Sequence, residues 1–139
     1  MVGKKDAQDR IFTLALDRIT KIELDLKHPY LEETFDADVY YQDTYGVTVM
    51  GDDQLLDVRL KVAASNAPYV LTKPFHHSQQ LESRDEDGSI IITLRVHHNF
   101  ELERLILGFG ESIEVMAPPI LRKRIRRKLQ KALESYIEV

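Results

Sequence analysis

The sequence contains no cysteine, which excludes disulfide bonds and thiolate metal sites. It has no apolar run near the roughly 18–20 residues that a membrane-spanning helix needs. The first residues, Met1 to Asp6, lack the apolar core of a secretory signal. We therefore expect a cytoplasmic protein that contacts no membrane, and no motif in the sequence calls for a cofactor.

The 139 residues are 43% hydrophobic and 30% charged, as in a soluble globular domain with a sizeable core. The net charge of −4 is unevenly distributed. Residues 1–57 carry 13 acidic and 6 basic side chains, whereas residues 58–139 carry 10 acidic and 13 basic ones. This asymmetry indicates two pieces of different origin, and the acidic total argues against a dedicated nucleic-acid binder.

Residues 1–27 are expected to be the last strand or strands of a truncated domain. Residues 22–26 alternate apolar and acidic side chains, which predicts a strand that ends before Pro29. Because a strand needs a partner sheet, we interpret this segment as the remainder of a larger unit. Residues 28–56 then form a linker with a short helix, for which Asp36 is the expected N-cap.

Residues 57–139 show a regular alternation of strand and helix patterns. Residues 58–62 alternate with the period of a strand, and Asn99 stands where a helix N-cap is expected. The predicted elements are strands at 58–62, 77–84, 89–97 and 112–116, and helices at 65–71, 99–108 and 118–137. The order βαββαβ followed by a helix predicts an α+β domain with a ferredoxin-like, four-stranded antiparallel sheet.

Four consecutive polar side chains lie where a predicted helix meets a predicted strand: His76, His77, Ser78 and Gln79. Loop residues in such a place can contact a ligand. Adjacent histidines in extended chain point to opposite faces, so a metal site would need His97 and His98 from the neighbouring strand. The alternative is that these residues cap the end of the sheet as neutral polar groups.

No arrangement of catalytic residues is expected. Ser78, His76 and Asp87 have the residue types of a hydrolytic triad, but the sequence has neither a Gly-x-Ser-x-Gly turn nor an oxyanion loop. Gly108-Phe109-Gly110 follows a predicted helix, whereas a phosphate loop precedes one. We therefore expect these glycines to end the helix, and we expect the protein not to be an enzyme.

The C-terminal helix is strongly basic, and its cations include Arg122, Arg124, Arg126, Arg127 and Lys128. Apolar residues at helical spacing predict that one face is buried. They are Leu121, Ile125, Leu129, Ala132, Leu133 and Tyr136. The basic face is then exposed, and it either binds nucleic acid, is solvated, or pairs with the acidic residues 1–57 of the same or a second subunit.

Arg18 is the remaining candidate for a ligand-binding residue. An arginine at the end of a strand is a natural bidentate clamp for a phosphate or a carboxylate. The alternative is a surface pair between Asp17 and Arg18, which would contribute little to stability. The sequence alone leaves both interpretations open.

Two regions carry a family resemblance. The first is residues 14–23, which include Leu16-Asp17-Arg18-Ile19. The second is residues 57–137, with His77-Ser78-Gln79, Asp87-Gly88, residues 106–110, residues 114–118 and Leu121-Arg122. Together they resemble the C-terminal portion of WYL-domain transcriptional regulators. The first region resembles the closing strand of the WYL domain, a small SH3/Sm-like barrel, and the second resembles the family's C-terminal WCX extension.

The resemblance implies a bacterial regulator with an N-terminal winged helix-turn-helix, a WYL sensor and this extension. It also implies a nucleotide-type or other anionic effector, and a homodimer that the extension helps to build. The chain departs from the family because it has no tryptophan, and hence no Trp-Tyr-Leu motif, and no DNA-binding domain. In the closing strand Arg18 carries over, whereas Phe12 and Leu14 stand where the family often has Arg and Phe.

We therefore interpret the chain as the regulatory ligand-sensing and dimerisation module of such a regulator, present as a fragment or a truncated gene product. Its expected partners are a second copy, through strand pairing or swapping, an anionic effector, and DNA through a helix-turn-helix outside this sequence. The alternative is a module that binds single-stranded nucleic acid directly through the basic helix.

Overall fold

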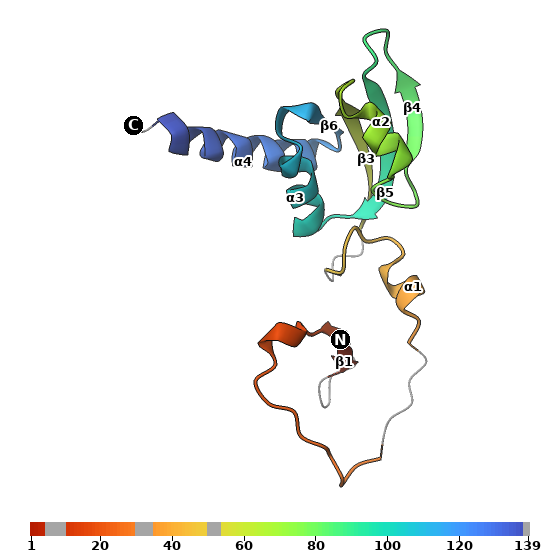
Figure 1. The fold of residues 1–139 in the computed structure, drawn as a ribbon, viewed down its shortest axis with the longest axis vertical. Helices are drawn as coiled ribbons and strands as arrows, with labels where there is room; N and C mark the ends of the chain where they lie inside the picture. Colours follow the sequence, from red (N-terminus) through yellow and green to blue (C-terminus); the bar gives the residue numbers. More distant parts are fainter. Residues whose placement is uncertain (5–10, 30–34, 50–53, 138–139) are drawn as a thin grey trace. The chain divides into compact units, whose positions relative to one another are not determined.

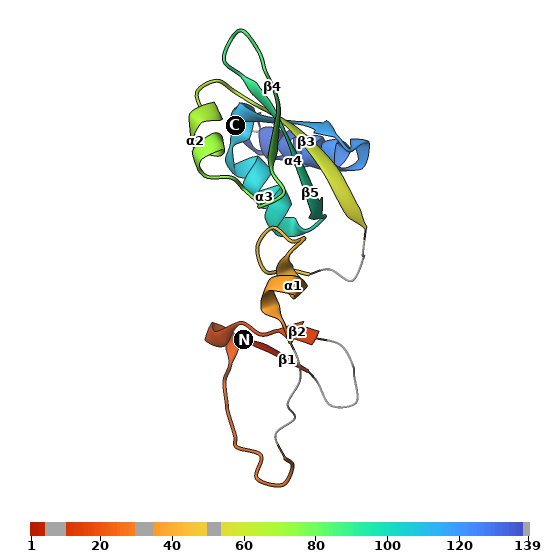
Figure 2. The ribbon, with the colours of Figure 1, turned by 90° about the vertical axis from the view of Figure 1, so that its right-hand side faces the viewer.

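The computed structural model describes residues 1–4, 11–29, 35–49 and 54–137. The chain divides into two compact units, Met1–Tyr40 and Tyr41–Val139, and each is described by itself (Figure 1). The N-terminal unit contains two short antiparallel strands, β1 (Val2–Lys4) and β2 (Ile11–Thr13), which are labelled in Figure 2. A short 3-10 helix, η1 (Leu16–Arg18), follows β2.

The strand predicted at residues 22–26 does not form, so this prediction is wrong. The segment has no regular secondary structure and pairs with no strand among the residues that the structure describes. Ile22, Leu24 and Leu26 are 80%, 88% and 91% exposed. Alternation fits a half-buried strand, but a strand forms only where a neighbour accepts its hydrogen bonds and another layer covers its apolar face. The strands of residues 1–27 lie at β1 and β2 instead.

The short helix predicted in the linker is confirmed as α1 (Ala37–Tyr41). The Asp36 carboxylate accepts hydrogen bonds from the backbone N–H groups of Asp38 and Val39, at 2.9 and 3.2 Å. These are two of the amides that a helix N-terminus leaves without an internal partner. Asp36 therefore acts as the expected cap.

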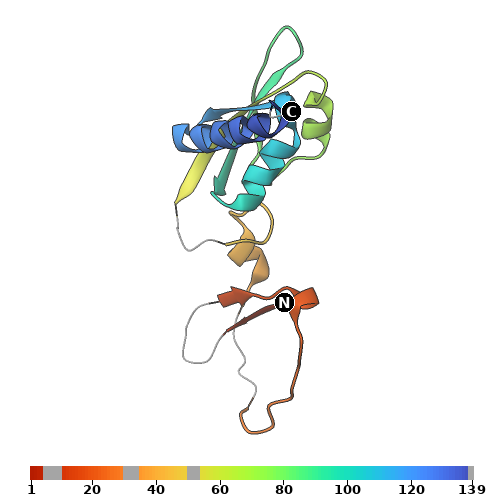
Figure 3. The same cartoon turned by 90° about the vertical axis from the view of Figure 1, so that its left-hand side faces the viewer.

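The C-terminal unit is a four-stranded antiparallel sheet with helices on one face (Figure 3). Its elements are β3 (Leu55–Val62), α2 (Ala67–Thr72), β4 (Gln80–Arg84), β5 (Ile90–His97), α3 (Phe100–Gly108), η2 (Gly110–Ser112), β6 (Ile113–Ala117) and α4 (Pro119–Ile137). The strand order is β4-β5-β3-β6, and every neighbouring pair is antiparallel. This is the ferredoxin-like arrangement, and the predicted α+β fold is confirmed.

The core lies between the sheet and the helices. β3 and β5 pair along all eight residues, from Leu55 opposite His97 to Val62 opposite Ile90. Alternate side chains of both strands are buried, as the period of two requires. The helices cover them with six buried apolar side chains: Ala67, Val70, Leu102, Ile106, Leu121 and Ile125. The pairing of β3 with β5 therefore positions the base on which α3 and α4 pack.

α3 begins and ends where the sequence predicts. Asn99 Oδ1 accepts a hydrogen bond from the backbone N–H of Leu102 at 2.8 Å, as an N-cap side chain does. At the other end Gly110 has a φ of +55°, a left-handed conformation that glycine adopts at little cost. The segment from Gly108 to Gly110 ends the helix and leads through η2 into β6, so the structural interpretation of these glycines is confirmed.

The buried face predicted for the C-terminal helix is correct only for its first turns. Leu121 and Ile125 are buried in the core, but Leu129, Leu133 and Tyr136 are 44%, 59% and 82% exposed. Figure 1 shows why, because the C-terminal half of α4 extends beyond the sheet. A helical stripe predicts which side of a helix is apolar, but the length of the neighbouring layer decides how much of the stripe is covered.

Candidate functional site

Arg18 ends η1 in the N-terminal unit and is exposed. The pair with Asp17, the alternative interpretation of Arg18, does not form, and the Arg18 side chain contacts no partner within the described ranges. Its backbone N–H bonds to the carbonyl oxygen of Ala15 at 3.2 Å. Anion binding by Arg18 stays a prediction.

His76 and Ser78 form a joint that fastens the approach to β4 onto β5. The Ser78 hydroxyl accepts a hydrogen bond from the backbone N–H of Arg95 at 2.9 Å and donates one to the Arg95 carbonyl at 3.1 Å. His76 Nδ1 lies 2.7 Å from the same hydroxyl. Burial, and then the neighbouring His77, lower the pKa of His76, so the ring is neutral at physiological pH.

His77 and Gln79 also bond to backbone groups of the C-terminal unit. His77 Nε2 lies 2.5 Å from the carbonyl oxygen of Gln42. The Gln79 amide donates to the Val70 carbonyl at 2.9 Å and accepts from the Phe75 N–H at 2.9 Å, so it ties the end of α2 to the start of β4. The four predicted site residues therefore use their polar atoms within the fold, and ligand binding by them stays a prediction.

The histidines do not assemble into a metal site. His76 and His77 are adjacent, with ring centroids 4.1 Å apart, but His98 bonds elsewhere. Across the part of the chain that the structure describes, no group of three His, Asp or Glu residues could hold a metal ion. The suggested contribution of His97 and His98 to such a cluster is therefore not realised.

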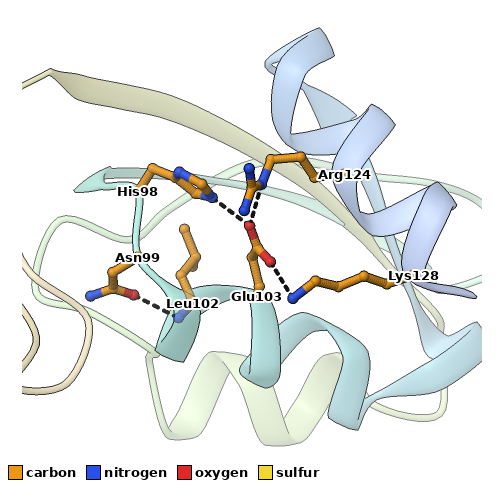
Figure 4. A network of polar contacts seen from close by, with 6 residues as sticks. All are labelled: His98, Asn99, Leu102, Glu103, Arg124 and Lys128. Atoms are coloured by element: carbon orange, nitrogen blue, oxygen red, sulfur yellow. Dashed lines mark hydrogen bonds and ion pairs between the residues drawn. The ribbon is translucent and has the colours of Figure 1, made fainter. Parts of the chain in front are cut away.

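The most distinctive polar cluster surrounds Glu103, which the sequence analysis did not identify (Figure 4). Glu103 lies on α3 with its side chain 1% exposed. Its Oε1 accepts hydrogen bonds from His98 Nε2 and Arg124 Nε, both at 2.6 Å. Lys128 Nζ forms an ion pair with Oε2 at 2.6 Å. One buried carboxylate thus links the end of β5, α3 and α4.

Two opposing effects act on the pKa of Glu103. Burial raises the pKa. The hydrogen bonds from Lys128, Arg124 and His98, together with the charge of Arg124, lower it by a larger amount, so that the pKa is about 2. Glu103 is therefore ionised at physiological pH. Because an ionised carboxylate can only accept hydrogen bonds, His98 must carry its proton on Nε2. The cluster thus joins one ionised carboxylate to three side chains from β5's end and α4.

This cluster changes the interpretation of the basic helix. Arg124 and Lys128 are bound to Glu103, and Arg122 donates to Glu114 at 2.7 Å and to the Val115 carbonyl at 2.5 Å. Three of the five predicted nucleic-acid-binding residues therefore have internal partners. The other two, Arg126 and Arg127, are exposed and have no ion-pair partner among the described residues.

A second cluster fastens the linker to the start of α3. The Glu101 carboxylate accepts hydrogen bonds from the backbone N–H groups of Val47 and Thr48, at 2.9 and 2.8 Å. The Asn99 amide donates to the carbonyls of Tyr45 and Thr48, at 2.9 and 3.0 Å. The backbone of His97 adds a bond to the Asp43 carbonyl at 2.7 Å. We call residues 42–48 the linker strap.

Gly46 is a position of the linker strap that has no room for a side chain. It has a φ of +79°, and a Cβ at this position would lie 2.5 Å from the Glu101 carboxylate. A larger residue would therefore be strained by its backbone conformation and would push Glu101 off the strap. The contact between the linker strap and Glu101 of α3 therefore depends on glycine at position 46.

The sequence contained a weak signal for Glu103 but none for its partners. Glu103 lies beside Leu102 and three residues before Ile106, so helical spacing places it at the edge of the apolar face of α3. A carboxylate there needs cationic partners. Arg124 lies 21 residues further along the chain, and local pattern cannot select it from the many cations of α4.

Comparison with known protein families shows the family to which the chain belongs. The family model of the WCX domain matches residues 54–133, which is more than half of the chain. The chain belongs to the WCX domain family. The match begins at β3 and includes the Glu103 cluster, but it covers none of residues 1–53. The predicted resemblance to the C-terminal extension is thereby confirmed, whereas the resemblance of residues 14–23 to a WYL domain stays a prediction.

Curated relatives of this WCX protein include Protein PafC of Mycobacterium tuberculosis, which is 33% identical over 86 residues. That alignment covers 62% of this chain and 26% of the relative. Protein PafC of Mycobacterium leprae is 35% identical over 86 residues, covering 61% of this chain and 25% of the relative. The chain thus spans about a quarter of the length of the curated relatives it matches. None of the helices described has the length and hydropathy needed to cross a bilayer.

Proposed function

We propose that this WCX protein is a regulatory module of a bacterial transcription regulator and acts through dimerisation and effector sensing. The observation that carries the proposal is the WCX match over residues 54–133, supported by the similarity to Protein PafC. DNA would be bound by a helix-turn-helix that belongs to the complete regulator. We propose no catalytic task for the module itself, because the WCX match and the similarity to Protein PafC point to regulation.

The contacts of α3 support a way in which such a module could transmit a signal. The start of α3 holds the linker strap through Asn99 and Glu101. Two residues further on, Glu103 holds α4 through Arg124 and Lys128. A movement of the strap would therefore change the position of α3, and α4 would follow because the ion pairs bind it to that helix. Arg18 in the N-terminal unit, and independently residues 76–79 in the C-terminal unit, are our proposed contacts for anionic ligands.

Dimerisation can be tested by a solution mass measurement on the full chain. We expect a monomer–dimer equilibrium with appreciable dimer at tens of micromolar, because regulators of this kind bind two half-sites as symmetric pairs. Multi-angle light scattering or sedimentation equilibrium over a concentration series measures it. A strict monomer throughout that range would remove dimerisation from the proposed function.

A second candidate function is favoured by Arg126 and Arg127, which have no ion-pair partner among the described residues. If α4 binds single-stranded nucleic acid, Arg126→Glu with Arg127→Glu should weaken binding at least about tenfold at low salt, because two phosphate contacts are lost and two repulsions are added. Fluorescence anisotropy with a short labelled oligonucleotide measures this.

The matched control for that experiment is Arg84→Glu with Lys27→Glu, which changes the net charge equally at two exposed positions outside α4. If both double variants weaken binding alike, the attraction is nonspecific and α4 is not the interface. The absence of any binding by the unaltered chain at low salt would end this candidate.

A further inference from the structure

The C-terminal half of α4 presents an apolar surface that the domain does not cover. Leu129, Leu133 and Tyr136 are exposed, and helical spacing places them on the same face as the buried Leu121 and Ile125. We call Leu129, Leu133 and Tyr136 the α4 stripe. Figure 1 shows this part of α4 extending away from the sheet towards the C-terminus. A hydrophobic face that continues beyond the core of a domain is a common form of protein interaction site.

The charges of α4 are arranged so that the stripe can meet an identical stripe. At about 100° per residue, Arg127 and Lys131 lie on roughly the opposite side of the helix from Leu129 and Leu133, and Lys123 lies more than one turn before the first residue of the stripe. Lys128 would border the stripe, but Glu103 holds its ammonium group at 2.6 Å. Arg126 is the one unpaired cation beside the stripe among the described residues. Two copies can therefore bring their stripes together without opposing their rows of cations.

We propose that the α4 stripe binds the α4 stripe of a second copy in an antiparallel helix pair. A two-fold axis near residue 131 would place Leu129 of one copy against Leu133 of the other, and the same contact would be made twice. Tyr136 would cover the ends of the contact with a large and rigid side chain. This proposal rests on the dimerisation part of the proposed function and names the surface that carries it.

The size and charge of the stripe define the kind of dimer. Three apolar side chains from each copy cover less than the about 800 Å² per partner of a standard interface, so the pair should be weak and reversible. α4 is basic overall, so the two helices repel each other at long range. Salt screens this repulsion and leaves the apolar contact intact. The dimer should therefore become tighter as salt rises, which is opposite to the behaviour of an acidic partner or a nucleic acid.

The test compares the unaltered chain with Leu129→Glu, Leu133→Glu and the control Ile120→Glu by sedimentation equilibrium at low and high salt. Ile120 is 65% exposed on the same helix, outside the stripe, so it controls for the loss of an exposed apolar residue. Each stripe variant should weaken the dimer at least about tenfold, and Ile120→Glu should leave it unchanged. Circular dichroism and thermal melting confirm that each variant is folded, since the substituted side chains are not part of the core.

The outcomes separate this inference from the proposed function. If the unaltered chain dimerises and the stripe variants dimerise equally well, the stripe is not the interface, whereas dimerisation stands. If the dimer weakens as salt rises, the contact is electrostatic and the inference is overturned as well. If the unaltered chain is a monomer at every concentration, both fail. A dimer that is lost in both stripe variants, kept in the control and tightened by salt supports the inference.

Discussion

Replacement of Glu103 by glutamine is expected to lower the free energy of unfolding by about 2 kcal/mol at pH 7. The pKa of Glu103 falls from the ordinary 4.5 to about 2 in the folded chain. At about 1.4 kcal/mol per pKa unit, the full linkage is about 3 kcal/mol. Arg124 and Lys128 are about half exposed, so solvent screens part of this energy. Glutamine keeps the volume of the side chain but loses its charge.

The pH dependence gives the sharper measurement. Because the pKa of Glu103 is lowered by folding, its contribution is complete above the unfolded pKa of about 4.5 and is lost as pH falls towards 2. The unaltered chain and Glu103→Gln should therefore differ most at neutral pH and converge in acid. Urea unfolding between pH 7 and pH 3 measures the difference.

Glu111→Gln is a suitable control for this experiment, because Glu111 is exposed and makes no ion pair within the described residues. It should show the same acid dependence as the unaltered chain. A constant gap between Glu103→Gln and the unaltered chain from pH 7 to pH 3 would contradict the assignment of the lowered pKa to Glu103.

Replacement of Asn99 by alanine should lower the free energy of unfolding by about 2–3 kcal/mol. Asn99 is fully buried and makes three hydrogen bonds, one as the N-cap of α3 and two to carbonyls of the linker strap. Loss of an N-cap costs about 1 kcal/mol, and each carbonyl left without its donor adds a similar amount. Chemical denaturation measures the sum.

Asn99→Asp separates the two roles of this side chain. Aspartate keeps the oxygen that caps α3, but it has no amide to donate to the carbonyls of Tyr45 and Thr48. Hydrogen exchange at Val47 and Thr48 should therefore accelerate in this variant, while the amides inside α3 stay protected. Unchanged exchange in the strap would show that Glu101 alone holds it.

The ferredoxin-like unit could be predicted because its signals are local. The alternation of β3 and β5 gives each strand one apolar face, and only pairing and helix packing bury it. Asn99 marks the start of α3 for the same reason, since a side-chain cap acts over three residues. Such patterns need no knowledge of distant parts of the chain.

The candidate site could be predicted only in part, because its contacts are long-range. The basic residues of α4 are evident from the sequence, but which of them are free depends on Glu103 and Glu114. His76 to Gln79 were candidates for ligand contacts because they are polar residues in a loop. Their bonds to Arg95, Val70 and Gln42 become visible only when β5, α2 and the linker strap are in place.

The sequence by itself determined the order of the elements in the C-terminal unit, the cap of α3 and the apolar side of α4, because each depends on the spacing of neighbouring residues. Only the tertiary structure decided three further points. Residues 22–26 form no strand because no described strand pairs with them. The apolar side of α4 is covered only as far as the sheet extends. Glu103 forms ion pairs with Arg124 and Lys128 because a buried carboxylate is stable only beside cations, and the fold brings these two within reach.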